Sequence, residues 1–554
     1  QLVATFLVRI VEGVWFVHPS QPIALDRRIL RALRRRRESQ FRSRRSSFTL
    51  NPGAMKTLST LFMGVICGAM SVYGLAQNES DVLRYGWIDP LHSARVTGMG
   101  GSFGALGADL SCLGMNPAGL GLYRRGDLSV NAGIHSGSTE ARWRNRKVDA
   151  AGNAVVGSNI GVALTYPSID ADWPFFTLAV AHQNRSPFDQ SINIDGVPAD
   201  LSVSDVFVAQ ALDDAATYGF LSTDSALGDG IIFPFGASLA WRAGLLQPDN
   251  ATGYATLAGD NVLVDRTIDR TGRMAETQIG FGTMYQDRIS FGLTLGIPKV
   301  DYEETSKHTE EVNAVSPTLQ RWEYNESLRI TGRGYLLRFG VLARVSESLR
   351  VGLAYQTRSR LTLTDTYSTD LQTTWLDDSQ FRAVSPTSNA EYLIFTPDRT
   401  TVSASFLLGK MGVLNADYVR SDMRRGELGE SDGILALDYD FEPENDAVQQ
   451  GYRVVHQARA GLELRVDEND EFRIRGGGGM STSPFVPEGV QSNANRYHAS
   501  VGAGYRIANV HFSAAWRTAW HSEDFYFMGA FSPEPPGILN RRSSALILGA
   551  GLRL

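Results

Sequence analysis

The glycine-rich run from Gly98 to Gly107 is the first segment whose residue types could do chemistry. Glycines at this density can cradle a phosphate, but no strand precedes the run and no Lys-Ser/Thr pair follows it, as a phosphate-binding loop requires. Residues 100–104 also match the G-x-S-x-G pattern of a nucleophilic serine. That serine needs a strand-to-helix turn inside an α/β sheet, and nothing in the sequence supplies one. Both interpretations are rejected.

The histidines are scattered along the chain without the spacing of metal ligands, so no metal and no cofactor is expected. His498 and His511 fall on adjacent predicted strands, which leaves a haem or metal role as an alternative. No Ser/His/acid group can be assembled at the strand ends. The protein is therefore predicted not to be an enzyme.

The elements that must position these residues are β-strands, because apolar residues occupy alternate positions from about residue 127 to the last residue. In 289–297 and 335–343 one face is apolar, while the other carries Arg, Ser, Thr and Gly. Strands are predicted to begin near residues 127, 157, 174, 271, 288, 318, 348, 390, 411, 452, 470, 494, 509 and 541. The number is fourteen, and an even number suits a closed single-chain barrel.

The turns predict which kind of barrel this is. Tight turns are predicted around residues 170–173, 285–288, 344–348, 409–412, 467–470 and 507–509, whereas the intervening connections are predicted to be long, that from 190 to 270 most of all. Short turns at one end and long loops at the other are typical of outer-membrane barrels. The prediction is an all-β protein with a 14-stranded antiparallel transmembrane β-barrel over 127–554, which ends inside its closing strand and crosses the cell outer membrane many times.

The N-terminal residues predict export. Met55 opens a secretory signal peptide over 55–76, with Lys56, an apolar stretch and a cleavage site before Gln77. Residues 1–54 are interpreted as an upstream extension translated in error, with a nucleic-acid-binding arm as the alternative. Because residues 1–54 carry a net charge of +8 and Lys56 adds +1, the mature chain carries −15, so no nucleic-acid partner is expected.

Residues 77–126 interrupt the alternation and are predicted to form a compact plug, or hatch, inside the barrel. Small residues allow a segment to fold tightly within a lumen that is otherwise open to water. The hatch glycines of interest are Gly98, Gly100, Gly101 and Gly104. The motif Asn116, Pro117, Ala118 predicts a turn in which the asparagine bonds to nearby backbone and the proline fixes φ.

The signal peptide, the segment 94–101, the Asn-Pro-Ala motif at 116–118 and the fourteen strands together carry a resemblance. The chain resembles the FadL family of outer-membrane transporters for long-chain fatty acids and other hydrophobic compounds, in particular the versions of Bacteroidetes-type bacteria. The resemblance covers essentially all of 77–554. One departure is the last residue, Leu554, where outer-membrane barrels typically end in Phe.

The resemblance implies a hatch that fills the barrel, a hydrophobic site reached from external loops, and sideways release of the ligand through a gap beside a kinked third strand. Here the third strand covers 176–187, and Asn184 and Pro187 mark the expected lateral opening. Pro187 can interrupt the hydrogen-bonded ladder or end the strand.

Two groups of residues are candidates for contact with ligand. The first is a hydrophobic loop groove made of Val208, Leu212, Phe220, Phe233 and Phe235; the alternative is that these residues pack the loop onto the barrel rim. The second comprises lumen arginines that could anchor a carboxylate: Arg338, Arg350 and Arg459. The alternative for the arginines is that they neutralise carboxylates such as Glu463 and Asp109.

The predicted function is outer-membrane transport of hydrophobic small molecules such as long-chain fatty acids through a hatch-plugged barrel. The alternative is a barrel that docks secreted proteins without transport. Expected partners are the hydrophobic ligand, outer-membrane lipids and the barrel assembly machinery, and the protein is expected to be a monomer.

Overall fold

The computed structural model describes residues 78–88, 91–218, 235–249, 253–312, 318–436, 439–467, 469, 471–487, 494–528 and 534–554. The predicted extension, the predicted signal peptide and Gln77 lie outside these residues, as do Phe220 and Phe233. Among the described residues no helix is both long enough and apolar enough to span a membrane.

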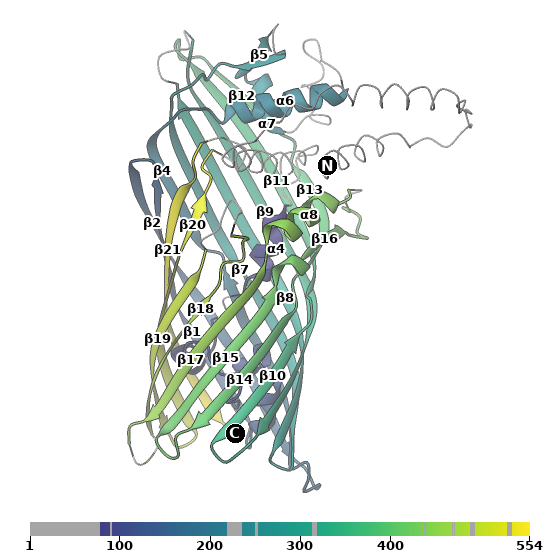
Figure 1. Ribbon diagram of the computed structural model, residues 1–554, viewed down its shortest axis with the longest axis vertical. Helices are drawn as coiled ribbons and strands as arrows, with labels where there is room; N and C mark the ends of the chain where they lie inside the picture. The colour runs from purple at the N-terminus through teal and green to yellow at the C-terminus, as the bar shows by residue number, and fades with distance from the viewer. Residues whose placement is uncertain are drawn as a thin grey trace, which may run out of the picture. The chain divides into compact units, whose positions relative to one another are not determined.

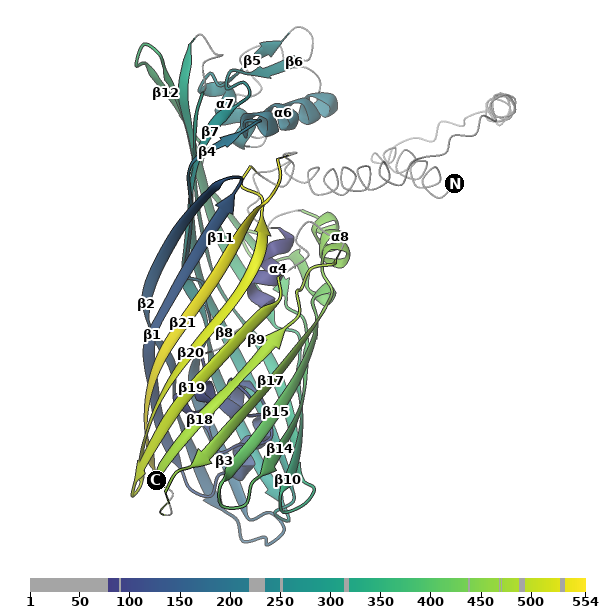
Figure 2. The same ribbon diagram turned by 60° about the vertical axis from the view of Figure 1, so that its left-hand side comes forward.

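Nineteen antiparallel strands form one sheet that closes on itself. The closing ladder joins β1 to β21, from the pair Asp127 and Arg553 to the pair Arg142 and Ile538. Figure 2 shows the blue β1 and β2 beside the yellow β21, where the barrel closes. The strands are β1 (Asp127–Trp143), β2 (Arg146–Pro167), β3 (Phe175–Pro187), β4 (Gln190–Ala199), β7 (Val262–Tyr285), β8 (Ile289–Glu311), β9 (Leu319–Arg344), β10 (Leu349–Gln356), β11 (Arg360–Trp375), β12 (Gln380–Val384), β13 (Ser388–Phe395), β14 (Arg399–Leu407), β15 (Gly412–Asp422), β16 (Glu427–Glu430), β17 (Val454–Arg465), β18 (Phe472–Ser481), β19 (Arg496–Ile507), β20 (Val510–Phe525) and β21 (Gly537–Arg553).

Several pairs of consecutive strands lie end to end and pair with the same neighbouring strand. β3 and β4 both pair with β7, and β10 and β11 both pair with β9. β12, β13 and β14 follow β11 and β10 in the same way, and β15 with β16 follows β14 and β13. Counted as continuous crossings, the wall has fourteen strands, so the prediction of a 14-stranded antiparallel barrel is confirmed.

The alternation along each strand separates an apolar outer face from a polar inner face. In β8 the side chains from Ile289 to Ile297 that face outward are apolar and exposed. From Lys299 onward the outward positions of β8 carry charged residues, including Asp301 and Glu303, both paired with Arg329. The outer surface of this strand therefore has a sharp upper limit to its apolar part.

The tight turns gather at one end of the barrel, the end that holds the C-terminus in Figure 1. At the other end two connections are shorter than predicted. β1 and β2 are joined by residues 144–145 alone, and β11 and β12 by residues 376–379. The prediction of long connections was wrong there because the strands themselves continue: β2 begins at Arg146 instead of near residue 157.

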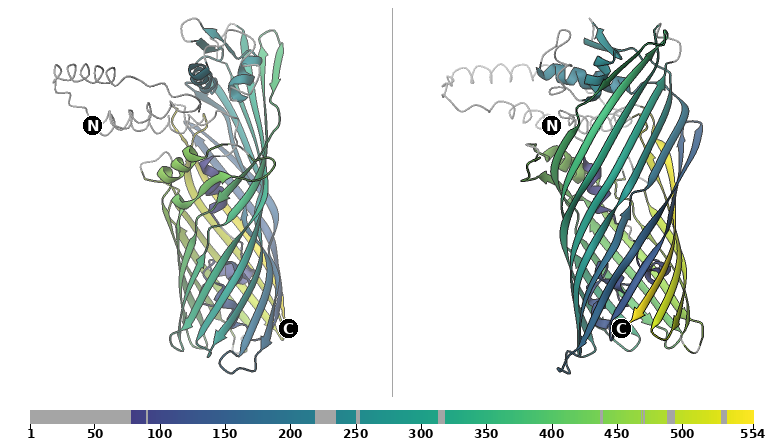
Figure 3. Two further views of the ribbon diagram at one scale, coloured as in Figure 1. Left: turned by 90° about the vertical axis from the view of Figure 1, so that its right-hand side faces the viewer. Right: turned by 180° about the vertical axis from the view of Figure 1, so that it is seen from behind.

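The longest connection is also shorter than predicted, since β4 occupies its first ten residues and β7 begins at Val262 instead of near residue 271. The strands around it rise above the rest of the wall, as the teal strands of Figure 3 show. The connection carries helices α6 (Ser204–Tyr218) and α7 (Phe235–Arg242) and the hairpin of β5 (Leu246–Asp249) and β6 (Gly253–Thr256). Helix α8 (Glu442–Gly451) lies in the connection from β16 to β17.

Candidate functional site: hatch, lumen cavity and wall opening

Among the described residues, four short helices precede β1 and form the hatch: α4 (Glu79–Gly86), α5 (Ala94–Gly98), η1 (Leu110–Gly114) and η2 (Pro117–Leu122). Figure 2 shows them in purple among the barrel strands. Each helix begins at a residue whose side chain accepts a hydrogen bond from the first turn: Asn78, Ser93, Asp109 and Asn116. Such caps let helices of five to eight residues form where propensity alone is insufficient.

Asn116 joins two parts of the hatch. Its Oδ1 accepts a hydrogen bond from the Ala118 amide at 3.1 Å, while its Nδ2 donates to the Gly104 carbonyl at 2.7 Å. Pro117 occupies the first turn of η2, where its fixed φ suits a helix start. The Asn-Pro-Ala motif is thus a helix cap whose second function is to hold the glycine-rich loop.

The wall beside η2 is lined with glycines that allow very close approach. A Cβ atom on Gly292 of β8 would lie 2.1 Å from the Pro117 carbonyl carbon, and one on Gly340 of β9 would lie 2.1 Å from Asn116 Oδ1. Both glycines face the lumen in the alternating pattern. Here the hatch backbone contacts the wall backbone without intervening side chains.

The predicted hatch glycines lie against the opposite wall. Gly100 has a φ of +68°, and a Cβ atom there would lie 2.4 Å from the backbone nitrogen of Gly478 in β18. The Gly104 amide and its neighbour, the Phe103 amide, both donate to the Asp417 carboxylate of β15. Gly98 approaches Gly502 of β19.

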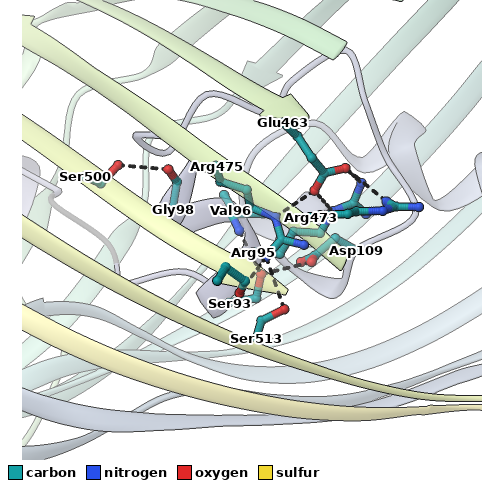
Figure 4. A network of polar contacts seen from close by, with 11 residues as sticks. Ser93, Arg95, Val96, Gly98, Asp109, Glu463, Arg473, Arg475, Ser500 and Ser513 are labelled. Carbon is teal, nitrogen blue, oxygen red and sulfur yellow. Dashed lines mark hydrogen bonds and ion pairs between the residues drawn. The ribbon is translucent and has the colours of Figure 1, made fainter. Parts of the chain in front are cut away.

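An ion network fastens α5 to the same wall (Figure 4). Arg95 makes a bidentate pair with Glu463 of β17, with Nε–Oε2 and Nη2–Oε1 distances of 3.0 and 2.9 Å. Arg473 and Arg475 of β18 also donate to Glu463, at 3.0 and 2.7 Å. Asp109 accepts from the Ser93 hydroxyl at 2.9 Å. One buried carboxylate therefore receives three guanidinium groups.

Helix α4 occupies an apolar part of the lumen nearer the loop end of the barrel. Its Val82 and Tyr85 are fully buried against inward-facing residues of β7, β8, β9, β11 and β13. Asp81 pairs with Arg84 and accepts a hydrogen bond from the Tyr392 hydroxyl at 3.1 Å. Burial raises the pKa of the Asp81 carboxyl, although both partners oppose the shift.

Cys112 lies in η1, inside the hatch, and its side chain is 2% exposed. Burial raises its pKa, so the thiol stays protonated and acts as a small apolar side chain.

Above α5 lies a lumen cavity of about 160 Å³. Hatch residues Trp87, His92 and Thr97 form part of its lining, and the wall contributes arginines from β17, β19, β20 and β21: Arg459, Arg496, Arg517, Arg541 and Arg542. Of the described residues that line it, Asp189 is the acidic one. The Arg496 guanidinium stands 4.3 Å from the ring centroid of Trp87, so cationic and aromatic surface adjoin inside the cavity.

The cavity reaches the wall at Ser186 and Pro187, where the ladder between β2 and β3 ends. That ladder runs from the pair Pro167 and Phe175 to the pair Asn159 and Gln183. Beyond it, within the described part of the chain, β2 pairs with β1, while β3 and β4 pair with β7. The two sides of the wall are therefore not joined by a ladder at this height, while above it β1 and β4 pack in one buried cluster that includes Trp143 and Ile194.

A β-bulge accompanies the separation. The register of β3 with β7 shifts between Asn184 and Ser186 and leaves Arg185 unpaired in that ladder, with its side chain buried. Its Nε lies 3.4 Å from Glu276 Oε2. The amide groups of Asn159 and Asn184 are buried beside the gap and make no hydrogen bond to any described residue. Buried amides without partners are costly and are rare outside functional sites.

The predicted arginines lie in three different settings. Arg459 lines the lumen cavity and donates to the Gly101 carbonyl at 3.2 Å. Arg338 is 1% exposed and bound to Glu276 and Gln356. Arg350 lies at the tight-turn end, away from the cavity.

The loop residues of the predicted groove pack against the raised part of the wall. Val208 and Leu212 of α6 are partly buried on a cluster that includes Trp322 and Leu371, and Phe235 of α7 stacks on Tyr367. This arrangement corresponds to the alternative prediction, in which the loop packs onto the rim.

Sequence reasoning missed Arg185, Glu276, Arg496 and Arg517. Arg185 keeps the lumen-facing phase of Ala181 and Gln183, so the alternation of β3 gave no signal for the bulge. Arg496 and Arg517 obey the alternation, but nothing in the sequence distinguishes them from other inward arginines.

No protein-family model matches the chain, and no curated protein matches it. Among solved structures, the chain is similar to a Pseudomonas aeruginosa FadL homologue, with a TM-score of 0.48, 11% identity and coverage of 84% of this chain and 99% of that chain. It is similar to the Pseudomonas putida toluene transporter TodX (0.45, 12%, 84% and 99%) and to the Ralstonia pickettii toluene transporter TbuX (0.41, 15%, 83% and 98%). Identities this low and scores below 0.5 carry no conclusion about what this chain binds.

Proposed function

We propose that this protein is an outer-membrane channel that moves hydrophobic small molecules inward and releases them sideways through the wall between β2 and β3. The closed barrel with an apolar outer face supports insertion in a bilayer, and the tight turns then face the periplasm. Residues 55–76 remain proposed as the signal peptide for export, and the protein as a transporter and not an enzyme.

The observation that carries this proposal is the end of the β2–β3 ladder at Asn159 and Gln183, beside a cavity that extends to Ser186 and Pro187. A ligand in the cavity meets a place where the described neighbouring strands are not hydrogen-bonded. The bulge at Arg185 directs β3 away from β2. The proposal assigns Asn184 and Pro187 to the edge of this opening.

Uptake measurements test the path. Residues 55–554 are expressed in a host that lacks its own transporter, and uptake of labelled oleate is compared with the empty vector. Ser186→Trp places a large ring in the cavity and is expected to lower uptake several-fold. Val180→Trp is the matched control, because Val180 lies on the same strand but faces outward, 46% exposed. Equal uptake by both variants, or uptake no faster than the vector with the barrel in place, overturns the proposal.

The finer proposal is that the ligand carries a carboxylate, as a fatty acid does. The cavity joins Trp87 to several arginines, and guanidinium groups bind carboxylates by paired hydrogen bonds. Arg496→Gln and Arg517→Gln are expected to reduce uptake of oleate but not of a neutral compound such as toluene. Equal loss for both compounds contradicts a carboxylate ligand and leaves the path itself untouched.

A second candidate is docking of secreted proteins without transport. It is favoured by the raised part of the wall, where α6 and α7 pack on β9 and β11 and offer a platform above the bilayer. Wild-type protein that inserts but takes up neither oleate nor toluene, in a strain whose secreted proteins are lost when its gene is deleted, supports this candidate.

A further inference from the structure

A second cavity lies at the tight-turn end of the barrel, on the other side of α5 from the lumen cavity. Its volume is about 350 Å³. The hatch segment Leu122–Asp127 and the lower ends of β18, β19, β20 and β21 line it. Arg125, Glu471 and Arg553 on its margin are exposed, so the cavity communicates with solvent at this end. It takes no part in the lateral path proposed above.

Arginines dominate the lining of this cavity. They come from the hatch and from three wall strands, and so surround the space from several directions: Arg95, Arg125, Arg473, Arg475, Arg506 and Arg553. A further one, Arg124, pairs with Asp287 on the neighbouring turn at 2.7 Å. The acidic residues of the lining are Asp109, Asp127 and Glu471.

The carboxylates do not balance the guanidinium groups. Glu463 stands just behind the lining and accepts from Arg95, Arg473 and Arg475 together. Asp109 accepts from the Ser93 hydroxyl and the Ser111 amide. Even when Glu463 and Asp287 are included, the seven described arginines of this lining outnumber the five described carboxylates. An excess of arginines about a solvent-filled space is the arrangement that binds multiply charged oxyanions.

We propose that this cavity binds a phosphate group on the periplasmic side of the hatch. Guanidinium groups donate planar pairs of hydrogen bonds, and a tetrahedral phosphate can accept such pairs from several sides at once. Arg506 of β19 and Arg553 of β21 both line the cavity. The phosphate belongs either to a soluble metabolite or to a lipid headgroup of the inner leaflet.

The cavity is also connected to the hatch. Arg95 is shared between the cavity lining and the Glu463 cluster, and α5 carries it. A phosphate bound here would neutralise the charge excess around Arg95 and is expected to stabilise the closed hatch.

Binding of inorganic phosphate to the full chain in detergent micelles, measured by calorimetry, tests the site. Saturable binding by the wild type is expected, with affinity about tenfold lower or worse in Arg506→Gln and in Arg553→Gln, because a charge-assisted hydrogen bond is lost. Arg344→Gln is the matched control: Arg344 lies at the same end, at the foot of β9, outside the cavity. It is expected to bind as the wild type does.

Arg125→Gln provides a second variant should a strand variant fail to fold, since Arg125 precedes β1 on an exposed turn. No saturable binding by the wild type, or equal weakening by Arg344→Gln, overturns the proposal. Repeating the titration in nanodiscs distinguishes a soluble phosphate from a lipid headgroup. Weaker binding of inorganic phosphate in phosphatidylglycerol than in phosphatidylcholine nanodiscs identifies a headgroup as the occupant, and equal binding identifies a soluble phosphate.

Discussion

Two walls of the barrel hold the same hatch by different means. On one side, Gly292 and Gly340 let η2 approach the backbone of β8 and β9 so closely that no side chain fits between them. On the other side, α5 is held by the Arg95–Glu463 pair and by the hydrogen bonds of its loop to Asp417. Shape complementarity secures the first contact, and charge secures the second.

The difference indicates which part of the hatch can move. A backbone contact without side chains has no alternative geometry, because any shift creates overlap or a void. Guanidinium groups on flexible stems can exchange partners, and Arg473 or Arg475 can retain Glu463 when Arg95 leaves. We therefore expect η2 to remain fixed while α5 shifts.

The largest effect is expected from Glu463→Gln on the charged wall. It leaves three arginines around a neutral side chain, and removing one partner of a buried ion pair costs about 3–5 kcal/mol. The free energy of unfolding is measured by urea titration in phospholipid bilayers. Glu471→Gln, at the exposed start of the same hairpin, is the control, and an equal loss in both variants contradicts the importance of this wall.

Gly292→Ala tests the glycine wall and is expected to cost about 1–3 kcal/mol by overpacking against Pro117. The matched control is Gly476→Ala in β18, where an added Cβ would have no neighbour within 4 Å. The same urea titration compares them. Equal stability of the two variants means that η2 can shift to accommodate the added methyl group. That result contradicts the view that the contact between η2 and β8 is rigid.

Two variants of Asn116 separate the stability that comes from capping η2 from the stability that comes from binding the glycine-rich loop. Asn116→Ala loses the side chain's hydrogen bonds to Gly104 and Ala118 and is expected to cost about 1–2 kcal/mol. Asn116→Asp keeps the acceptor for the Ala118 amide but cannot donate to Gly104. Its unfolding free energy should fall between those of the wild type and the alanine variant; identity with the wild type would show that the Gly104 contact contributes nothing.

The smallest effect is expected from Arg124→Gln. Arg124 pairs with Asp287 in the open, with side-chain exposures of 40% and 62%. Such pairs contribute about 0–1 kcal/mol and are weakened by salt. The change in unfolding free energy should vanish at 1 M salt, while that of Glu463→Gln should persist because its charges are buried.

The sequence predicted the barrel well because each strand repeats the same two-residue pattern. Eleven of the fourteen predicted starts lie within two residues of the observed ones, from Asp127 to Gly412 and on to Val510. The two that differ most, β2 and β7, belong to strands that continue into polar surroundings above the apolar belt. There the alternation loses its apolar residues and with them the signal.

The site was harder to predict, because it depends on departures from the pattern. The Asn116 cap is local and follows from residue types, so its turn could be anticipated. The gap beside Asn159 depends on which strands fail to pair. Arg338 and Glu276 bind each other although they lie 62 residues apart in the sequence, on separate strands. No local signal specifies contacts of that kind.

The abrupt change on the outer face of β8 has a mechanical consequence. The part of the strand from Lys299 to Glu311 rises roughly 40 Å along its length, at about 3.3 Å per residue, beyond the apolar belt. With its neighbours it forms a raised part of the wall on one side of the barrel, where ion pairs such as that of Arg329 with Glu303 connect adjacent strands. If the protein is the proposed channel, compounds that approach from that side meet the raised strands, whereas those from the side of β17–β21 meet the lower rim first. Its entrance would therefore be more open on the side of β17–β21.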